Sequence, residues 1–208
     1  MLVVVHGGHE HHQLPSPRMV ETYRFVVDAG ADAVVNHHQH CFCGYEVYKG
    51  KPIFYGLGNF CFDWKVPYEN ANWNYGYAVT IDFRDGGEVD FELHPYEQCN
   101  GAPRLHLLPP QAFESRLREL NATIADPTAL DEATRRYYAS ESEGILNALF
   151  TTRSRVLNAL LRRGLRRWLE DERSRLRIKN TLCCESHLDK VQYAVSAGLP
   201  TAVDKNGF

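Results

Sequence analysis

The sequence predicts a mixed α/β domain flanked by helices and followed by an α-helical extension. A strand–helix–strand unit is indicated at the amino terminus, where β-branched residues 2–5 precede an amphipathic stretch and a second apolar run at 31–35. Further on, alternating apolar residues on both sides of glycine-containing turns indicate two hairpins. We expect the α/β domain to span residues 1–108, the extension 109–197, and a loosely ordered tail 198–208.

The first strand and the helix after it have well-marked boundaries. The β-branched composition of residues 2–5 is typical of a buried parallel strand. Ser16 is suited to cap the helix, Pro17 to occupy its first turn and Gly30 to end it. A helix that crosses over between two neighbouring strands makes them parallel. Their carboxyl ends therefore meet at the same edge of the sheet.

Both predicted strands end in histidines. His6 follows the first strand, whereas His37, His38 and His40 follow the second. Ligands bind at the carboxyl ends of strands in open α/β sheets, and neutral imidazole is the commonest metal ligand in proteins. Alternate residues of an extended segment share a face, so His38 and His40 can contact one ion. The cluster therefore favours a divalent transition-metal site over a polar loop without a ligand.

Other polar residues near these histidines admit more than one interpretation. Glu10 could bind an ion, act as a base or orient a bound water. Asn59 could return to the histidines or cap a turn. Cys41 and Cys43 could be soft ligands, although a buried thiol is ordinarily a small apolar side chain. The hairpin of residues 75–96 is expected to form a sheet edge rather than part of a catalytic site.

Composition limits the class of protein and its partners. With 44% apolar residues the chain is expected to fold around a core, and a net charge of −3 gives no argument for nucleic-acid binding. Six cysteines without a CxxC pair favour reduced thiols in a cytoplasmic compartment. No apolar run has the length of a membrane span, and no signal peptide is recognisable. The chain opens directly in a strand, which favours a domain whose amino-terminal part is missing.

The second half of the chain is predicted to be helical and rich in arginine. Amphipathic stretches indicate helices at 111–124, 128–150 and 152–179, and the last carries leucines and a tryptophan opposite several arginines. Such a helix can bind an anionic membrane surface or an acidic polymer, but a solvated arginine face over a packed helix is the favoured interpretation. Near the end, Cys184 and His187 could form a nucleophilic pair or belong to a docking motif.

Three segments carry a family resemblance: VHGGHE, SPRMVETYRFVVDAGADAVVNHHQH and GYEVYKGKPIFYGLGNFCFD. In this order and spacing they resemble the CapA family, the capsule or poly-γ-glutamate biosynthesis proteins with a metallophosphatase-like (calcineurin-like) fold. The resemblance covers roughly residues 1–96, with Asn36 where the family more often has glycine. It implies a sandwich of two mixed sheets flanked by helices, with a dinuclear centre of manganese, iron or zinc at the strand ends.

The resemblance also suggests roles for individual residues, which divide into metal ligands, catalytic groups and substrate-binding groups. The expected metal ligands are His6, His38 and His40; the catalytic groups are His37, as ligand or acid, and Glu10, as orienting group; and the substrate-binding groups are His9 and Asn59. If the protein is catalytic, a metal-activated hydroxide would attack a phosphoester or a similar electrophile.

Other readings of the resemblance remain open. The family's opening half, with an Asp-containing strand and an Asn-His motif, has no counterpart before Met1, so an inactive truncated fragment is one alternative. A second is a non-catalytic accessory protein that binds an anionic polymer or capsule-assembly proteins. A third is a zinc-dependent amidohydrolase, which shares the histidine cluster. Members of the family can be membrane-anchored.

Overall fold

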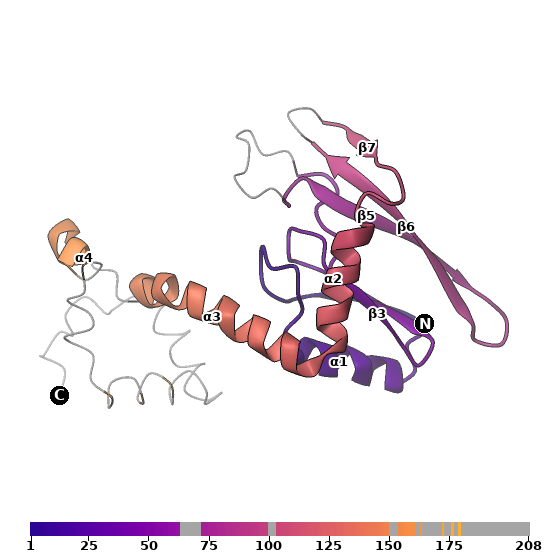
Figure 1. Ribbon diagram of the computed structural model, residues 1–208, viewed down its shortest axis with the longest axis horizontal. Helices are drawn as coiled ribbons and strands as arrows, with labels where there is room; N and C mark the ends of the chain where they lie inside the picture. The colour runs from indigo at the N-terminus through magenta and orange to yellow at the C-terminus, as the bar shows by residue number, and fades with distance from the viewer. Residues whose placement is uncertain are drawn as a thin grey trace, which may run out of the picture. The chain divides into compact units, whose positions relative to one another are not determined.

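The computed structural model describes residues 1–62, 72–99, 103–149 and 154–160, together with the single residues 163, 172, 176 and 179. The chain divides into two compact units, Met1–Ser140 and Glu141–Phe208. The first unit contains two β-sheets (Figure 1). The fold of the described residues is therefore mixed α/β, as the sequence predicts.

Four strands form the first sheet, in the spatial order β1 (Leu2–His6), β2 (Ala33–His37), β4 (Lys51–Phe54) and β3 (Tyr45–Tyr48). Strands β1, β2 and β4 run parallel, whereas β3 is antiparallel to β4. Helix α1 (Pro17–Asp28) joins β1 to β2, so the predicted strand–helix–strand unit is confirmed. His6 and His37 are partners in the register of β1 and β2, which brings the two histidine segments together.

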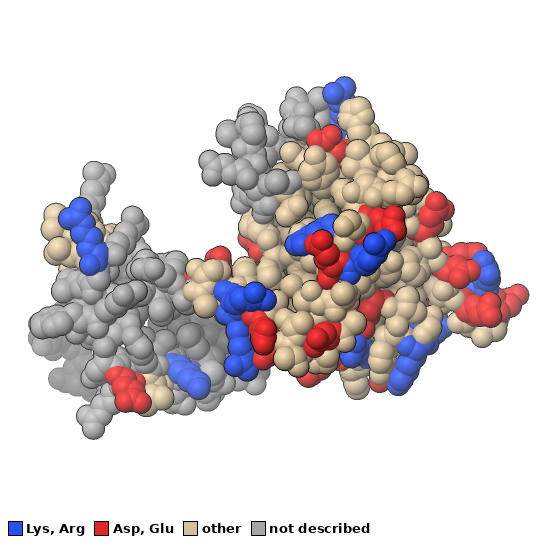
Figure 2. All heavy atoms as spheres, in the orientation of Figure 1, with Lys and Arg blue, Asp and Glu red and all other residues tan. Residues whose placement is uncertain are grey.

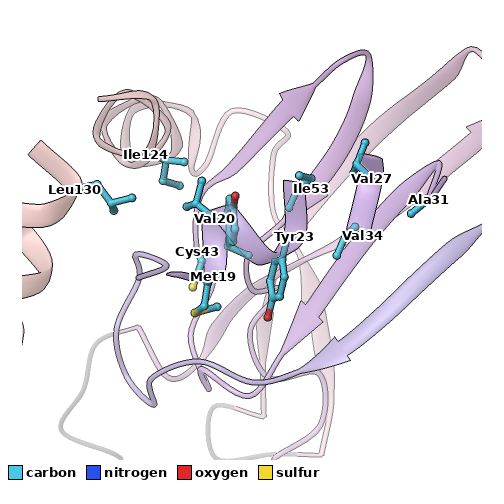
Figure 3. Close-up of a cluster of buried hydrophobic side chains, with 11 residues drawn as sticks. Met19, Val20, Tyr23, Val27, Ala31, Val34, Cys43, Ile53, Ile124 and Leu130 are labelled. Atoms are coloured by element: carbon cyan, nitrogen blue, oxygen red, sulfur yellow. The ribbon is translucent and has the colours of Figure 1, made fainter. Parts of the chain in front are cut away.

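Helix α1 covers one face of this sheet. It begins where the sequence predicts, because the Ser16 side chain accepts a hydrogen bond from the amide of Met19 and Pro17 occupies the first turn. Its buried side chains form a hydrophobic cluster with residues of β2 and β4 (Figure 3). The members of this cluster include Met19, Val20, Tyr23, Val27, Val34 and Ile53.

The second sheet is antiparallel throughout its described residues. It consists, in order, of β5 (Tyr75–Phe83), β6 (Val89–Gln98) and β7 (Leu105–Leu107). The β5–β6 hairpin was predicted, whereas β7 was not, and the expectation of two mixed sheets holds for the first sheet only. The sheets pack face to face, with the ring of Phe54 in β4 5.1 Å from that of Phe91 in β6.

Strand β1 differs from the fully buried strand that its composition suggested. Leu2 is 46% and Val4 65% exposed, whereas Val3 and Val5, on the opposite face, pack against the α1 cluster. The reason is positional: β1 lies at the edge of the first sheet and pairs with β2 alone among the described strands. Composition reports how apolar a strand is, but not whether other elements cover it.

The division of the chain into units also differs from the expected boundary after residue 108. Helix α2 (Glu114–Ala125) packs its apolar stripe into the core, and the amide of Tyr45 in β3 donates to Asn121 Oδ1 at 2.7 Å. Helix α3 (Pro127–Leu149) contributes Leu130 to the α1 cluster. Because these helices pack on the first sheet, the first unit extends to Ser140. The buried stripe of α2 is Leu117, Leu120 and Ile124.

In the second unit the structure describes α4 (Arg155–Leu160) and a few single residues. The rest of the arginine-rich helix expected at 152–179, the segment with Cys184 and His187, and the tail lie outside the described residues. None of the helices, searched over the described positions, is both long enough and apolar enough to cross a membrane. On the visible face of the first unit, acidic and basic side chains are interspersed (Figure 2).

Candidate histidine site at the ends of β1 and β2

A cavity of about 590 Å³ lies at the carboxyl ends of β1 and β2. Its lining includes all four predicted histidines and Asn59, so the structure brings most of the expected site residues together. The opposite side of the cavity is formed by the loop after β4 and by the second sheet. These further lining residues are Leu57, Gly58, Phe60, Cys61, Phe62, Tyr77, Ala78, Val79 and Tyr96.

The second sheet therefore contributes to the site, which the sequence did not lead us to expect. The hairpin of residues 75–96 was interpreted as a sheet edge, yet β5 and β6 supply part of the cavity wall. This contribution follows from the face-to-face packing of the two sheets, because packing over β4 places β5 beside the loop that follows it. The amide of Tyr77 in β5 donates to the carbonyl of Leu57 in that loop at 2.9 Å.

His6 and His38 form the closest pair in the cluster. The Nε2 of His6 lies 3.1 Å from the Nδ1 of His38, with the two rings nearly edge to face. Two imidazole nitrogens bound at about 2.1 Å to one tetrahedral or octahedral ion lie roughly 3.0–3.4 Å apart. The backbone of His38 has a φ of 118°, a conformation rare for residues with a side chain. The pair thus has the spacing of two ligands of one ion, held on a strained turn.

Asn59 contacts His40 directly, which decides between the two roles considered for it. Its Oδ1 lies 2.8 Å from His40 Nδ1, and its Nδ2 donates to the carbonyls of His40 and Trp73. Because an amide oxygen only accepts, His40 Nδ1 carries the proton and Nε2 keeps its lone pair. Asn59 therefore returns to the histidines and selects the tautomer of His40 in which Nε2 is a potential ligand.

His37 and Glu10 lie on either side of the close pair. Burial lowers the pKa of His37, and the nearby His6 lowers it further. Glu10 is exposed, and its Oε1 lies 3.9 Å from the Nε2 of His38, the ring nitrogen that does not face His6. A carboxylate near the outer nitrogen of a ligating histidine is the usual arrangement for fixing its orientation.

His9 lies against helix α3 and is not among the described residues that line the cavity. Its Nε2 is 2.9 Å from the hydroxyl of Tyr138, and its ring contacts Tyr137 as well. Burial lowers the pKa of His9, and the positive charge of Arg18 lowers it further. A substrate-binding role for His9 stays a prediction, and the geometry shows its contacts with the tyrosines of α3.

Asn36 is a residue whose importance the sequence analysis missed. We interpreted it as a turn residue, but it lies within β2, fully buried, opposite Val5 of β1. Its Oδ1 accepts from the Gly7 amide and the Tyr23 hydroxyl, and its Nδ2 donates to the carbonyls of Gly7 and Tyr55. It therefore ties the loop after β1 to α1 and β4. An amide inside an apolar strand was the signal that could have revealed this, since buried polar groups require partners.

The two cysteines near the histidines are core residues. Cys41 and Cys43 are fully buried, and neither is among the described residues that line the cavity. Burial raises the pKa of Cys43, whose thiol donates to the carbonyl of His12 at 3.4 Å. A neutral thiol in a hydrogen bond is a poor metal ligand, because the thiolate is the ligating form.

The side chains at the cavity provide some, but not all, of the ligands that a metal ion needs. Among the described residues, no group of three or more His, Cys, Asp or Glu side chains is placed to hold one ion. The pair of His6 and His38 has the chemistry and the spacing for two coordination positions. His40 Nε2 and His37 belong to the same cavity and offer further imidazole donors.

Fold and site together define a mixed α/β protein with a histidine cluster at the ends of parallel strands. Residues 1–64 match the family model described as bacterial capsule synthesis protein PGA_cap. The chain is 39% identical over 107 residues to the capsule biosynthesis protein CapA of Bacillus anthracis, which is 50% of this chain and 25% of that protein. It is 35% identical over 105 residues to the PGA biosynthesis protein CapA of Bacillus subtilis (strain 168), or 50% of this chain and 26% of that protein.

A shorter match relates the chain to a rhizobial protein. It is 58% identical over 40 residues to an uncharacterized protein of Sinorhizobium fredii, which is 19% of this chain and 9% of that protein. The amino-terminal part of the chain is therefore similar to the CapA proteins. The matches span about a quarter of the length of the two CapA relatives. All seven expected site residues lie within the 64 residues that the family model covers, whereas helix α3 lies outside them.

Proposed function

We propose that the chain is part of a CapA-type protein of capsule or poly-γ-glutamate biosynthesis, with a metallophosphatase-like fold and a divalent-metal site at the histidine cavity. The capsule role is supported by the relatives, which are named for capsule and PGA biosynthesis. The metal site is supported above all by one observation, the 3.1 Å separation of His6 Nε2 and His38 Nδ1. Anionic polymer and capsule-assembly proteins are the proposed partners.

Individual residues of this chain would have different roles at such a site. His6 and His38 would hold a manganese, iron or zinc ion, which when bound polarises a phosphoester and lowers the pKa of a water. Glu10, whose Oε1 lies 3.9 Å from the outer nitrogen of His38, would help to orient that ring. His37, whose pKa is lowered by burial and by the nearby His6, would be a further ligand or an acid.

A second ion is part of the proposal for the whole protein. His40 Nε2, freed by the bond from Nδ1 to Asn59, and the half-buried His37 are the donors in the same cavity that the close pair does not use. The ring centroids of His38 and His40 are 6.2 Å apart, so His40 lies next to the close pair. A dinuclear centre is the arrangement that activates both sides of a phosphoester.

Hydrolysis of bis(4-nitrophenyl) phosphate by the full chain, stripped of metal and then supplied with Mn²⁺ or Zn²⁺, tests this proposal. We expect metal-dependent hydrolysis that falls at least about 100-fold in His38→Ala, because a ligand is lost. His106→Ala, an exposed histidine on β7, serves as the matched control and should retain full activity. Hydrolysis that ignores both the metal and His38 would contradict the proposal. An inert chain that binds polyglutamate would instead favour the accessory role.

A further inference from the structure

The wall of the cavity that faces the histidines carries exposed aromatic rings. Phe60 is 66% and Phe62 44% exposed, and both line the cavity. An exposed phenylalanine ring forgoes the free energy that burial of its apolar surface would gain. Large apolar side chains that stay exposed beside a cluster of polar groups are typical of a ligand-binding surface.

The two rings are held in place. Phe60 packs edge to face on Tyr96, with centroids 5.8 Å apart, and Phe62 packs in the same way on Trp73, at 5.4 Å. The amide of Phe62 also donates to Gln98 Oε1 at 2.8 Å, which fixes the loop to β6. These contacts give an ordered apolar surface rather than a pair of free side chains.

A glycine seats this loop against the second sheet. Gly58 has a φ of +91°, and a Cβ there would lie 2.7 Å from the carbonyl oxygen of Tyr75 in β5. Only a residue without a side chain permits so close an approach. The position of the aromatic rings relative to the histidines is therefore set by backbone packing, and His40 itself lies 5.2 Å from Phe62 between ring centroids.

The aromatic rings indicate the class of ligand. An uncharged ring would stack on the phenylalanine side chains and exclude water from them. The histidines remain available for a single reactive anionic group.

We propose that Phe60 and Phe62 form a subsite for an uncharged ring, so that the substrate class of the site is a small phosphoester with such a ring next to the phosphoryl group. The ring lies on the two phenylalanines, and the phosphoryl group faces His6 and His38. This assignment rests on the proposed function for the position of the reacting group. The subsite itself stands on the exposure and packing of the two aromatic side chains.

Two phosphonates that differ only in the ring test the subsite. Dissociation constants of phenylphosphonate and methylphosphonate for the Zn²⁺-supplied full chain are measured by NMR titration. We expect phenylphosphonate to bind at least about 10-fold more tightly, because the ring gains apolar contact. Phe60→Ala and Phe62→Ala should each remove most of this preference and leave methylphosphonate unchanged. Phe25→Ala, an exposed phenylalanine on α1 outside the cavity, is the matched control and should change neither affinity.

Equal affinities for the two phosphonates, or a preference that survives both substitutions, would overturn the subsite. Phe60→Leu provides a second variant, since it keeps apolar volume and loses the ring, and it should reduce the preference in part. His38→Ala separates the two proposals. If it leaves methylphosphonate binding unchanged while the ring preference still depends on Phe60, the metal site fails and the subsite stands. If methylphosphonate binding requires His38 but the ring adds no affinity, the subsite fails and the metal site stands. Absence of binding by either phosphonate overturns both.

Discussion

The hydroxyl of Tyr138 lies 2.9 Å from Nε2 of His9, across a separation of 129 residues in the chain. The neighbouring Tyr137 stacks on His12, with ring centroids 4.1 Å apart, and donates its hydroxyl to the carbonyl of Glu10 at 3.4 Å. Helix α3 thus holds the loop that carries Glu10 toward His38. Helix α3 lies outside residues 1–64, which the family model matches.

Replacing Tyr138 with phenylalanine should loosen this loop without unfolding the protein. The substitution keeps the ring and removes one partly exposed hydrogen bond, so we expect a loss of about 1 kcal/mol or less in the free energy of unfolding. The amides of His11 and His12, bonded to the carbonyls of Gln39 and His9, should exchange faster with solvent. Hydrogen exchange measures this, and unchanged rates would contradict the claim that α3 holds this loop. Tyr48→Phe, which removes a bond to Asp28, is the control.

The Asn36 substitution is expected to have a large effect on stability. Asn36→Ala leaves buried partners on Gly7, Tyr23 and Tyr55 without their hydrogen bonds, which should lower the free energy of unfolding by about 2–4 kcal/mol. Urea unfolding measures the loss. Gln111→Ala, at an exposed position before α2, should stay within about 0.5 kcal/mol of the wild type. A loss below 1 kcal/mol for Asn36→Ala would show that the network does not organise the strand ends.

Much of the fold was predictable because its signals are local. Consecutive residues determine the cap at Ser16, the Pro17 turn and the alternation in β5 and β6. The parallel pairing of β1 and β2 then brings the histidines together. The site was predictable to the same extent, since its histidines follow two strands directly. Asn59 was uncertain from sequence because its partner His40 is reached only through the path of the loop.

Features that depend on long-range packing were not predictable in the same way. The exposure of Val4 depends on which elements cover β1, and the cavity wall from β5 depends on how the two sheets pack. The contact of Tyr138 with His9 requires the course of α3. No pattern in neighbouring residues encodes these relationships.

His12 should make stability depend on pH in mildly acidic solution. Burial and, to a smaller extent, the nearby His9 together lower its pKa from 6.5 to about 4. The unfolded chain therefore binds a proton that the folded chain does not between pH 6.5 and 4. Stability should be unaffected above pH 6.5 and should fall as the pH drops toward 4, by about 1–2 kcal/mol once partial exposure is allowed for.

The matched variant is His12→Phe, which keeps a ring on Tyr137 and removes the ionisable group. The buried Nε2 of His12 has no hydrogen-bond partner among the residues that the structure describes, so the substitution breaks no bond seen at that atom. The difference in unfolding free energy between variant and wild type, measured by urea titration, should grow in favour of the variant as the pH falls from 6.5 to 4. If this difference did not change with pH, the pH dependence of stability could not be assigned to His12.

Asn59→Ala should weaken metal binding by about 10–100-fold, because the acceptor that selects the tautomer of His40 is removed. Zinc affinity measured by competition with a chromophoric chelator tests this. Asn121→Ala is the control, since it breaks a comparable bond to the Tyr45 amide away from the cavity and should leave zinc affinity unchanged. Equal effects of the two substitutions would indicate a general loss of structure rather than a role at the site.

The most direct measurement is the zinc affinity of His6→Ala, His38→Ala and the double variant, compared with the full wild-type chain. If His6 and His38 are ligands of one ion, each single substitution should lower the zinc affinity at least about 100-fold. The double variant should then lose much less binding free energy than the sum of the losses in the two single variants. His106→Ala should bind as the wild type does. Wild-type zinc affinity in both single variants would contradict the central claim that the ends of β1 and β2 form one metal site.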